Sequence, residues 1–152
     1  MADTQQTLII AKPDAVQRGL TGTIISRLEA RGLKLVAVKF HVIDESLASR
    51  HYAEHQGKGF YAGLVEYIGS GPSAVMVFEG SDAIAAARAS IGSTNPVAAA
   101  PGTIRGDFAL QVGRNLVHGS DSPESAAREV ALFFDVGEIV SYARDGDRWI
   151  VE

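Results

Sequence analysis

Apolar residues recur along the chain with two periods, one typical of strands and one typical of helices. A short apolar run from Thr7 to Ala11 ends at Pro13 and predicts a central strand. Residues 34–42 alternate between apolar and polar side chains, which predicts a half-buried strand. The side of this strand that is expected to face the core carries Val36, Val38, Phe40 and Val42.

Two further strands are expected at residues 74–78, after a turn at residues 69–72, and around Val117. Helical periodicity and capping residues fill the intervals between the strands. The first expected helix is capped by Thr21 and ended by Gly32, and the second is capped by Asp44 or Ser46 and continues through His55. Residues 60–68 form the third, and the fourth is capped by Ser81 or Asp82 and closed by Gly92. The fifth is capped by Ser122, has Pro123 at its first position and ends near Phe134.

The resulting order is β-α-β-α-α-β-α-loop-β-α, which contains a split βαβ unit. It predicts an α/β, or α+β, sandwich of the ferredoxin-like class, with helices packed on a four-stranded antiparallel sheet. We find no linker or repeat and expect one domain over residues 1–152. Residues 93–114 have little periodicity, and long loops in compact domains are usually functional or disordered.

Composition and charge exclude or disfavour several classes of protein, but they do not indicate which reaction this one catalyses. The chain is 46% hydrophobic and 21% charged, contains no cysteine, and has a net charge of −4. Disulfide-stapled secretion is therefore excluded, and a broad nucleic-acid footprint is disfavoured. No apolar run approaches the roughly 18 residues of a membrane span, and the N-terminus does not resemble a signal peptide. We expect a cytoplasmic protein that binds neither membrane nor nucleic acid.

His51-Tyr52-Ala53-Glu54-His55 fits the H-x-x-E-H spacing of some zinc proteases. Two histidines four residues apart share a helix face and could bind Zn²⁺. Three fixed positions often recur by chance, however, and no second helix offers a third ligand. The pattern favours ordinary surface histidines over a metal site.

Three isolated cations stand at places where a ligand could reach them. Lys12 directly follows an apolar strand, Arg88 has small neighbours on its helix, and Arg105 lies between Gly102 and Gly106. Each alone is typical of a surface charge. Together, in a chain of net negative charge without a GxxxxGK[ST] loop, they are consistent with a dispersed phosphate clamp.

His118 closes an apolar run and is followed by Gly-Ser-Asp, so it is either a packed core histidine or a nucleophile. The next helix has an apolar face of Ala126, Val130, Phe133 and Phe134. Glu129 falls at the edge of that face, where its carboxylate could reach His118 or Ser120. A histidine oriented by a carboxylate is a general pattern for a nucleophile or base. Taken alone, this segment leaves both interpretations open.

Four motifs together resemble nucleoside diphosphate kinase. They are NLVHGSD at residues 115–121, AKPDAVQRGL at 11–20, SGP at 70–72 and PGTIRGDF at 101–108. The resemblance runs from Thr7 to Glu152. It implies transfer of the γ-phosphoryl group of a nucleoside triphosphate to a nucleoside diphosphate by a ping-pong mechanism, through a phosphohistidine on His118.

The resemblance also implies a role for each matching residue. Ser120 and Glu129 orient His118, which attacks through Nδ1. Tyr52 acts near the phosphates and sugar, and Phe60 and Val112 hold the base. The residues implied to contact the phosphates or sugar are Lys12, Arg88, Thr94, Arg105 and Asn115. His51 and His55 become incidental neighbours of Tyr52.

The resemblance further implies Mg²⁺ that bridges the substrate phosphates, with no protein metal site, and a homo-oligomer. The C-terminal segment through Glu152 favours a hexamer over a tetramer or dimer, and its last residues could reach a neighbouring nucleotide. Three places depart from the family pattern: Ala15, residues 59–62 around Phe60, and Phe78. None removes a catalytic group, but the second could loosen the base-binding lid.

A catalytically silent nucleotide-binding or interaction module on the same fold is the alternative function. A silent relative is expected to have lost part of the set Lys12, Arg105, Asn115 and His118, and this chain retains all four. The sequence therefore favours the enzyme. It does not indicate nucleotide preference or regulatory partners.

Overall fold

The computed structural model describes residues 4–152. Four strands and seven α-helices, joined by short 3-10 turns, make up this part of the chain. The strands are β1 (Thr4–Ala11), β2 (Lys34–His41), β3 (Ser73–Ser81) and β4 (Val117–Gly119). The helices are α1 (Pro13–Gln17), α2 (Thr21–Ala30), α3 (Glu45–His51), α4 (Tyr61–Ile68), α5 (Ala83–Ile91), α6 (Ile104–Phe108) and α7 (Pro123–Phe133).

The strands form one antiparallel sheet in the order β2-β3-β1-β4. β1 and β3 occupy the centre and pair over eight residues, whereas β4 pairs with β1 over only three. The long central pair explains why Thr7 to Ala11 reads as a continuous apolar run, since both of its faces are covered. The order and direction of the strands confirm the expected ferredoxin-like α+β class.

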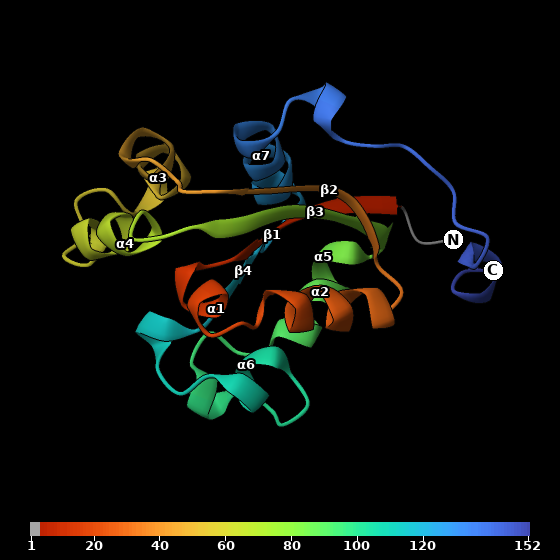
Figure 1. Cartoon of the computed structure of the whole chain (residues 1–152), viewed down its shortest axis with the longest axis horizontal. Coiled ribbons are helices and arrows are strands. Elements are labelled where there is room, and N and C mark those ends of the chain that lie inside the picture. Colours follow the sequence, from red (N-terminus) through yellow and green to blue (C-terminus); the bar gives the residue numbers. More distant parts are fainter. Residues whose placement is uncertain (1–3) are drawn as a thin grey trace.

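Helices cover both faces of the sheet (Figure 1). On one face, α2 and α5 pack over Ile9, Met76 and Phe78, which are fully buried. On the other, α3, α4 and α7 pack over Leu8 and Ile10, which are also fully buried. Because successive residues of β1 point to opposite faces, one strand supplies both cores. No helix between residues 4 and 152 is long and apolar enough to cross a membrane.

The expected alternation in β2 is wrong beyond its first half. The register with β3 shifts between Leu35 and Ala37, so Val36 and Ala37 are both buried. This irregularity moves the later apolar residues to the other face, as a β-bulge does. Val38, Phe40 and Val42 are 54%, 62% and 56% exposed, which leaves an apolar stripe on the edge strand of the sheet and just beyond its end.

Several helix ends differ from their predicted positions. Thr21 begins α2 from within and makes no capping hydrogen bond. α3 ends at His51 rather than His55, and residues 53–55 form a separate 3-10 turn. Asp82 precedes α5 in a left-handed conformation, and its side chain does not cap. Ser122 does cap α7, because its Oγ accepts a hydrogen bond from the Ser125 amide at 3.1 Å.

Residues 93–114 are ordered, although their sequence has little periodicity. They contain α6 and two 3-10 turns, Pro96–Ala98 and Val112–Arg114. Two cations hold this segment in place. Arg18, directly after α1, donates to the Phe108 carbonyl at 2.7 Å, and Arg27 of α2 lies 2.7 Å from the Asp107 carboxylate. The segment is therefore fixed by contacts distant in sequence rather than by helical or strand periodicity.

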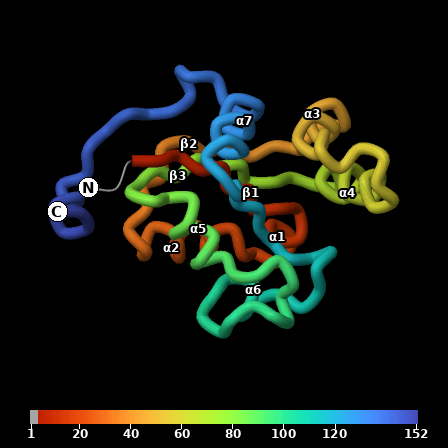
Figure 2. The backbone as a smooth tube through the Cα atoms, turned by 180° about the vertical axis from the view of Figure 1, so that it is seen from behind, coloured from red at the N-terminus to blue at the C-terminus, as the bar shows by residue number. Residues whose placement is uncertain are grey.

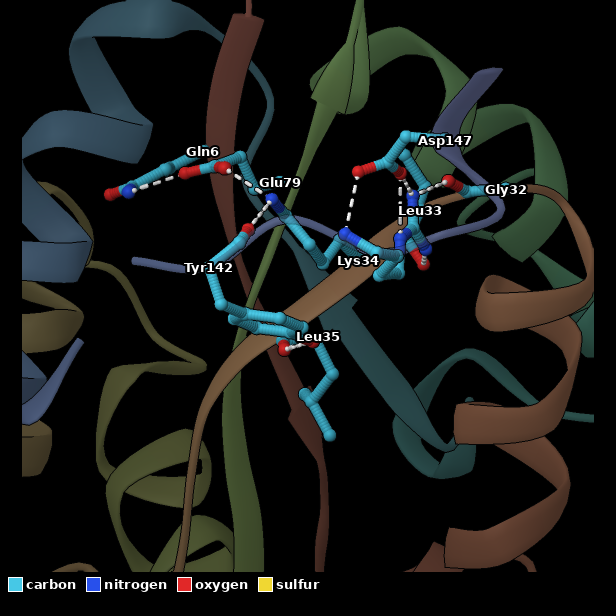
Figure 3. A network of polar contacts seen from close by, with 9 residues as sticks. Gln6, Gly32, Leu33, Lys34, Leu35, Glu79, Tyr142 and Asp147 are labelled. Atoms are coloured by element: carbon cyan, nitrogen blue, oxygen red, sulfur yellow. Dashed lines mark hydrogen bonds and ion pairs between the residues drawn. The ribbon is translucent and has the colours of Figure 1, made fainter. Parts of the chain in front are cut away.

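The C-terminal segment leaves α7 and crosses to the turn between α2 and β2 (Figures 1 and 2). A set of polar side chains holds it there, which we call the C-terminal clamp (Figure 3). Arg144 donates to the carbonyls of Gly32 and Leu33 at 3.0 and 3.2 Å. The Tyr142 hydroxyl donates to the Leu35 carbonyl at 2.6 Å. The members of the clamp are Lys34, Glu79, Tyr142, Arg144 and Asp147.

Candidate active site

β4 presents His118 toward α3 and α7. His118 lies opposite Ile10 in the sheet, and its neighbours in β4 face the core under α5. A Cβ atom at Gly119 would lie 2.8 Å from the Ile91 side chain, so only glycine permits this close packing of β4 on α5. The strand therefore places one polar side chain between two tightly packed positions.

A carboxylate from α7 holds the imidazole of His118. The Nε2 atom of His118 lies 2.9 Å from Glu129 Oε1, and the Ser120 hydroxyl donates to the same oxygen at 2.7 Å. The Leu8 amide donates to Ser120 Oγ at 3.1 Å, which fixes the hydroxyl as a donor toward Glu129. We call these three residues, His118, Ser120 and Glu129, the His118 cluster. When Nε2 carries the proton, the lone pair of Nδ1 is left available.

Glu129 is ionised in this cluster although it is only 4% exposed. Burial alone raises the pKa of its carboxyl group, but the hydrogen bonds from His118 and Ser120 and the charge of His118 outweigh burial. The pKa falls from 4.5 to about 2. Glu129 is therefore a fixed negative charge beside the imidazole at every pH near neutrality.

Lys12 and Asn115 meet beside the start of β4. The Lys12 ammonium donates to the Asn115 side-chain oxygen, and the Asn115 amide donates to the Thr94 carbonyl at 3.0 Å. Burial lowers the pKa of Lys12 from 10.5 to about 8, with Asp14 opposing and Arg105 adding to the decrease. An incoming anion would stabilise the charged form of this amine.

Arg105 and Arg88 supply two further cations. Arg105 is 7% exposed and donates to the carbonyls of Asn115, Gly92 and Val117 at 3.2, 3.2 and 2.6 Å. Burial and the nearby Arg88 lower its pKa to about 10, so it remains charged at neutral pH. Arg88 donates to the Gly119 carbonyl at 3.1 Å. Both guanidiniums also line the same cavity, so each supports β4 and faces a potential ligand.

The glycine beside Arg105 serves packing rather than approach to a ligand. A Cβ atom at Gly106 would lie 2.1 Å from the Ala100 carbonyl oxygen. Gly106 lies inside α6, where its amide donates to Thr103 Oγ1 at 3.0 Å. Gly106 therefore allows α6 to pack closely on Ala100 and does not form a turn around a ligand.

A cavity of about 250 Å³ joins most of the predicted site. Among the predicted residues, its walls carry Tyr52, Arg88, Thr94, Arg105, His118 and Glu129. Lys12, Asn115 and Ser120 lie directly behind these residues through the hydrogen bonds described above. Burial, and then the charge of Glu129, raise the pKa of Tyr52 to about 12, so its phenol remains a hydrogen-bond donor.

The two predicted base-binding residues lie outside the cavity. Phe60 and Val112 are 54% and 53% exposed and belong to different segments. Phe60 contacts His55, whose ring lines the cavity, at a centroid distance of 5.4 Å. A larger hollow of about 850 Å³ lies between α7 and residues 134–141, and none of the predicted site residues lines it.

His51 is the residue that sequence reasoning missed. The prediction that it is an incidental surface histidine is wrong, because it is 4% exposed and packs edge-on against His118 at a centroid distance of 4.8 Å. Burial, and then the charge of His118, lower its pKa to about 3, so it stays neutral. Only the apolar spacing of α3 could have indicated burial, and the polar residues around it hide that signal.

The zinc-protease spacing does not survive in the structure. α3 ends at His51, so His51 and His55 do not share one helix face. The Glu54 side chain is 65% exposed and lies 3.8 Å from His55. Within residues 4–152, no group of three or more His, Asp or Glu side chains is placed to hold a metal ion. The cavity instead combines an oriented imidazole with cations, which suits transfer of an anionic group.

Comparison with known proteins agrees with this chemistry. The family model for nucleoside diphosphate kinase matches residues 5–139. A nucleoside diphosphate kinase from Methanosarcina barkeri is 61% identical over 92% of this chain and 94% of its own, and one from Herpetosiphon aurantiacus is 56% identical over 97% and 99%. The structure of a halophilic nucleoside diphosphate kinase from Halobacterium salinarum in complex with CDP has a TM-score of 0.96 at 51% identity, and covers 99% of this chain and 100% of that one.

Proposed function

The chain belongs to the nucleoside diphosphate kinase family, and we propose that its reaction passes through a phosphohistidine on His118. As a member of that family it is a phosphotransferase that moves a phosphoryl group from a nucleoside triphosphate to a nucleoside diphosphate. The observation that carries the proposal is the 2.9 Å contact between His118 Nε2 and the ionised Glu129. That contact leaves Nδ1 as the nucleophilic nitrogen.

The proposed transfer has two half-reactions. In the first, Nδ1 of His118 forms a bond to the γ-phosphorus while the bond from that phosphorus to the bridging oxygen breaks, and the nucleoside diphosphate leaves. In the second, a terminal phosphate oxygen of another diphosphate takes the phosphoryl group from Nδ1. The imidazole gains positive charge as the N–P bond forms, and Glu129 beside Nε2 stabilises that charge.

The cations supply the positioning and charge neutralisation that phosphoryl transfer requires. Lys12, Arg88 and Arg105 approach the phosphates, with Thr94 and Asn115 holding the position of the Lys12 amine. Tyr52 also lines the cavity, and its protonated phenol is a hydrogen-bond donor for the phosphates or sugar. In the proposed complex the base lies between Phe60 and Val112, which contact it without reading its identity, so several bases are accepted.

Mg²⁺ fits this site as an ion that arrives with the nucleotide. The charged side chains beside His118 include the cations Arg88 and Arg105, which do not bind a metal ion. The carboxylates lining the cavity are Glu54, Asp121 and Glu129. Glu129 is engaged by His118, so Glu54 and Asp121 are available to water molecules around the ion. Bound Mg²⁺ offsets phosphate charge, and its preference for phosphate oxygens and water agrees with a site that offers few protein ligands.

The proposal also includes a homo-oligomer, with a hexamer favoured over a tetramer or dimer. It is supported by the exposed apolar stripe formed by Val38 and Phe40 on the edge strand β2 and by Val42 just beyond its end. Trp149 near the C-terminus is 80% exposed, which is unusual for a large aromatic side chain. We place the enzyme in the cytoplasm, where its substrates are used. Light scattering of the purified protein measures the mass that decides the assembly.

The phosphohistidine is tested by incubating the protein with γ-labelled ATP and Mg²⁺. The wild type is expected to carry acid-labile label that is released on addition of a nucleoside diphosphate. His118→Ala should carry none, while His41→Gln, which changes a histidine of β2, should label like the wild type. Label that survives in His118→Ala would overturn the mechanism. Nucleotide binding without label in the wild type would instead support the silent module.

A further inference from the structure

A strained turn lies immediately before the strand that carries His118. The Val117 amide donates to the Asn115 carbonyl at 2.9 Å, two residues back, which closes a three-residue turn around Leu116. Leu116 has a φ of 75° and is fully buried. A non-glycine residue in this region is strained and persists only when its surroundings hold it there.

Residues beyond the end of β1 hold this turn. The Leu116 amide donates to Asp14 Oδ2 at 3.0 Å, and the Leu116 carbonyl accepts from the Lys12 amide at 2.9 Å. The other carboxylate oxygen of Asp14 accepts a hydrogen bond from the Tyr67 hydroxyl of α4. The Asp14 carboxylate therefore bridges the turn and a helix on the other side of the sheet.

The turn organises the proposed phosphate-binding side chains. Asn115, at its first position, contacts Lys12 and the Thr94 carbonyl through its side chain, and its carbonyl accepts from Arg105 Nε at 3.2 Å. His118 follows two residues after Leu116. A change in the backbone of Leu116 would therefore move the nucleophile relative to the cations.

Tyr67 connects this turn to the proposed base-binding segment. It lies on α4, which begins directly after Phe60. Its ring is 4.5 Å from the Arg114 guanidinium and 5.7 Å from the Lys12 ammonium. Burial, and then the hydrogen bond to Asp14, raise the pKa of the phenol well above its usual range, so the hydroxyl remains a donor.

We propose that Asp14 and Tyr67 are a positioning pair that holds Leu116 in its left-handed conformation and couples the base-binding helix to the phosphate-binding turn. Neither side chain contacts the reacting atoms. This role rests on the proposed function, because it concerns the placement of Lys12 and Asn115 relative to His118. Positional errors of this kind reduce phosphoryl transfer without removing a catalytic group.

The test measures the rate of His118 phosphorylation at saturating ATP and Mg²⁺ in Tyr67→Phe, Asp14→Asn and Asp14→Ala. Tyr67→Phe keeps the ring and removes one donor, so we expect a decrease of about threefold to tenfold. Asp14→Ala should slow the step about 100-fold, and Asp14→Asn should recover part of the rate because its amide oxygen can still accept from Leu116. The final stoichiometry of label should equal that of the wild type.

The matched control is Tyr142→Phe, which also removes a tyrosine hydroxyl that donates to a distant acceptor, the Leu35 carbonyl of the C-terminal clamp. It should phosphorylate at the wild-type rate. Equal rates in Tyr67→Phe, Asp14→Asn and Tyr142→Phe would overturn the proposal, even if Asp14→Ala does not fold. Absence of label in the wild type would instead refute the phosphohistidine, so the two failures are distinguishable.

Coupling to the base is tested by a double-mutant cycle. If Tyr67 transmits the position of α4, the losses in kcat/KM from Phe60→Ala and Tyr67→Phe should not multiply in the double variant, with a deviation of at least about threefold. Independent losses that multiply would refute the coupling. In that case any slow phosphorylation of Tyr67→Phe would belong to the turn alone.

Discussion

The His118 cluster and the C-terminal clamp use the same kinds of contact in different surroundings. In both, carboxylates pair with basic side chains at about 3 Å and a hydroxyl group supports the arrangement. The Glu129 side chain is 6% exposed, whereas Arg144 and Asp147 in the clamp are 28% and 33% exposed. Water screens the clamp, but it cannot compensate a broken contact around Glu129. Burial therefore decides how much each contact matters.

The largest effect on activity is expected from removing a carboxylate of the buried His118 cluster. Glu129→Ala leaves the His118 Nε2 proton and the Ser120 hydroxyl without an acceptor and frees the imidazole to rotate. We expect kcat/KM to fall about 100-fold, and Glu129→Gln, which retains an acceptor oxygen, to lose less. Steady-state kinetics with ATP and a nucleoside diphosphate measure both. A loss below threefold in Glu129→Ala would show that the carboxylate does not orient the nucleophile.

The next effect concerns a buried cation that lacks a close ionic partner comparable to Glu129. Lys12 has a pKa of about 8 because burial disfavours its charge. As pH rises through this value the free enzyme loses an ammonium, so kcat/KM should decrease up to about tenfold per pH unit between pH 8 and 9. Lys12→Arg should be less active but should lack this decrease, since its guanidinium stays charged. An identical alkaline profile in both proteins would assign the decrease to another group.

The dependence of the free energy of unfolding on acid pH tests the contribution of the buried Glu129 carboxylate. Its pKa in the folded chain is about 2, below the ordinary 4.5, so as pH falls the unfolded chain binds a proton first. This contribution to the free energy of unfolding is complete above about pH 4.5 and is lost as pH falls toward 2. The difference in stability between the wild type and Glu129→Gln should therefore shrink over that range. Urea unfolding at several pH values measures it, and a constant difference would contradict the assigned pKa.

The smallest effect is expected from the more exposed clamp. Arg144→Ala removes partly buried contacts to Asp147 and to the carbonyls of Gly32 and Leu33. We expect the melting temperature to fall by no more than about 4 °C and kcat/KM to remain unchanged. Thermal unfolding at two salt concentrations and steady-state kinetics measure these quantities. A tenfold loss of activity would mean that the clamp acts on the site as well as on the C-terminal segment.

Local sequence signals predict helix caps and the inward face of a helix, because neighbouring residues determine both. Ser122 caps α7 as expected, and helical spacing places Glu129 on the inward side of that helix. The motif around His118 indicated the nucleophile only through the family resemblance. Taken alone, its own residues slightly favoured a packed core histidine.

Other features depend on contacts that no local pattern records. The bulge at Val36 exposes apolar residues of β2 that the alternation predicts to face the core. The packing of α3 buries His51 against His118. Asp14 was visible as part of a motif, but its partner Tyr67 lies 53 residues away. Such pairings are set by the sheet order and the helix layers, so they become visible only in three dimensions.

The shortness of β4 has a consequence for how this chain can tolerate insertions and deletions. Val117 and Gly119 face α5 while His118 faces α7, so adding or removing one residue at this point would exchange the inward and outward sets. A valine would then occupy the cavity, and the imidazole would enter an apolar core. The turn at Leu116, held by Asp14 and the Lys12 amide, fixes where the strand begins. Which side chain of β4 enters the cavity therefore depends on the alternation of its residues between the two faces of the sheet.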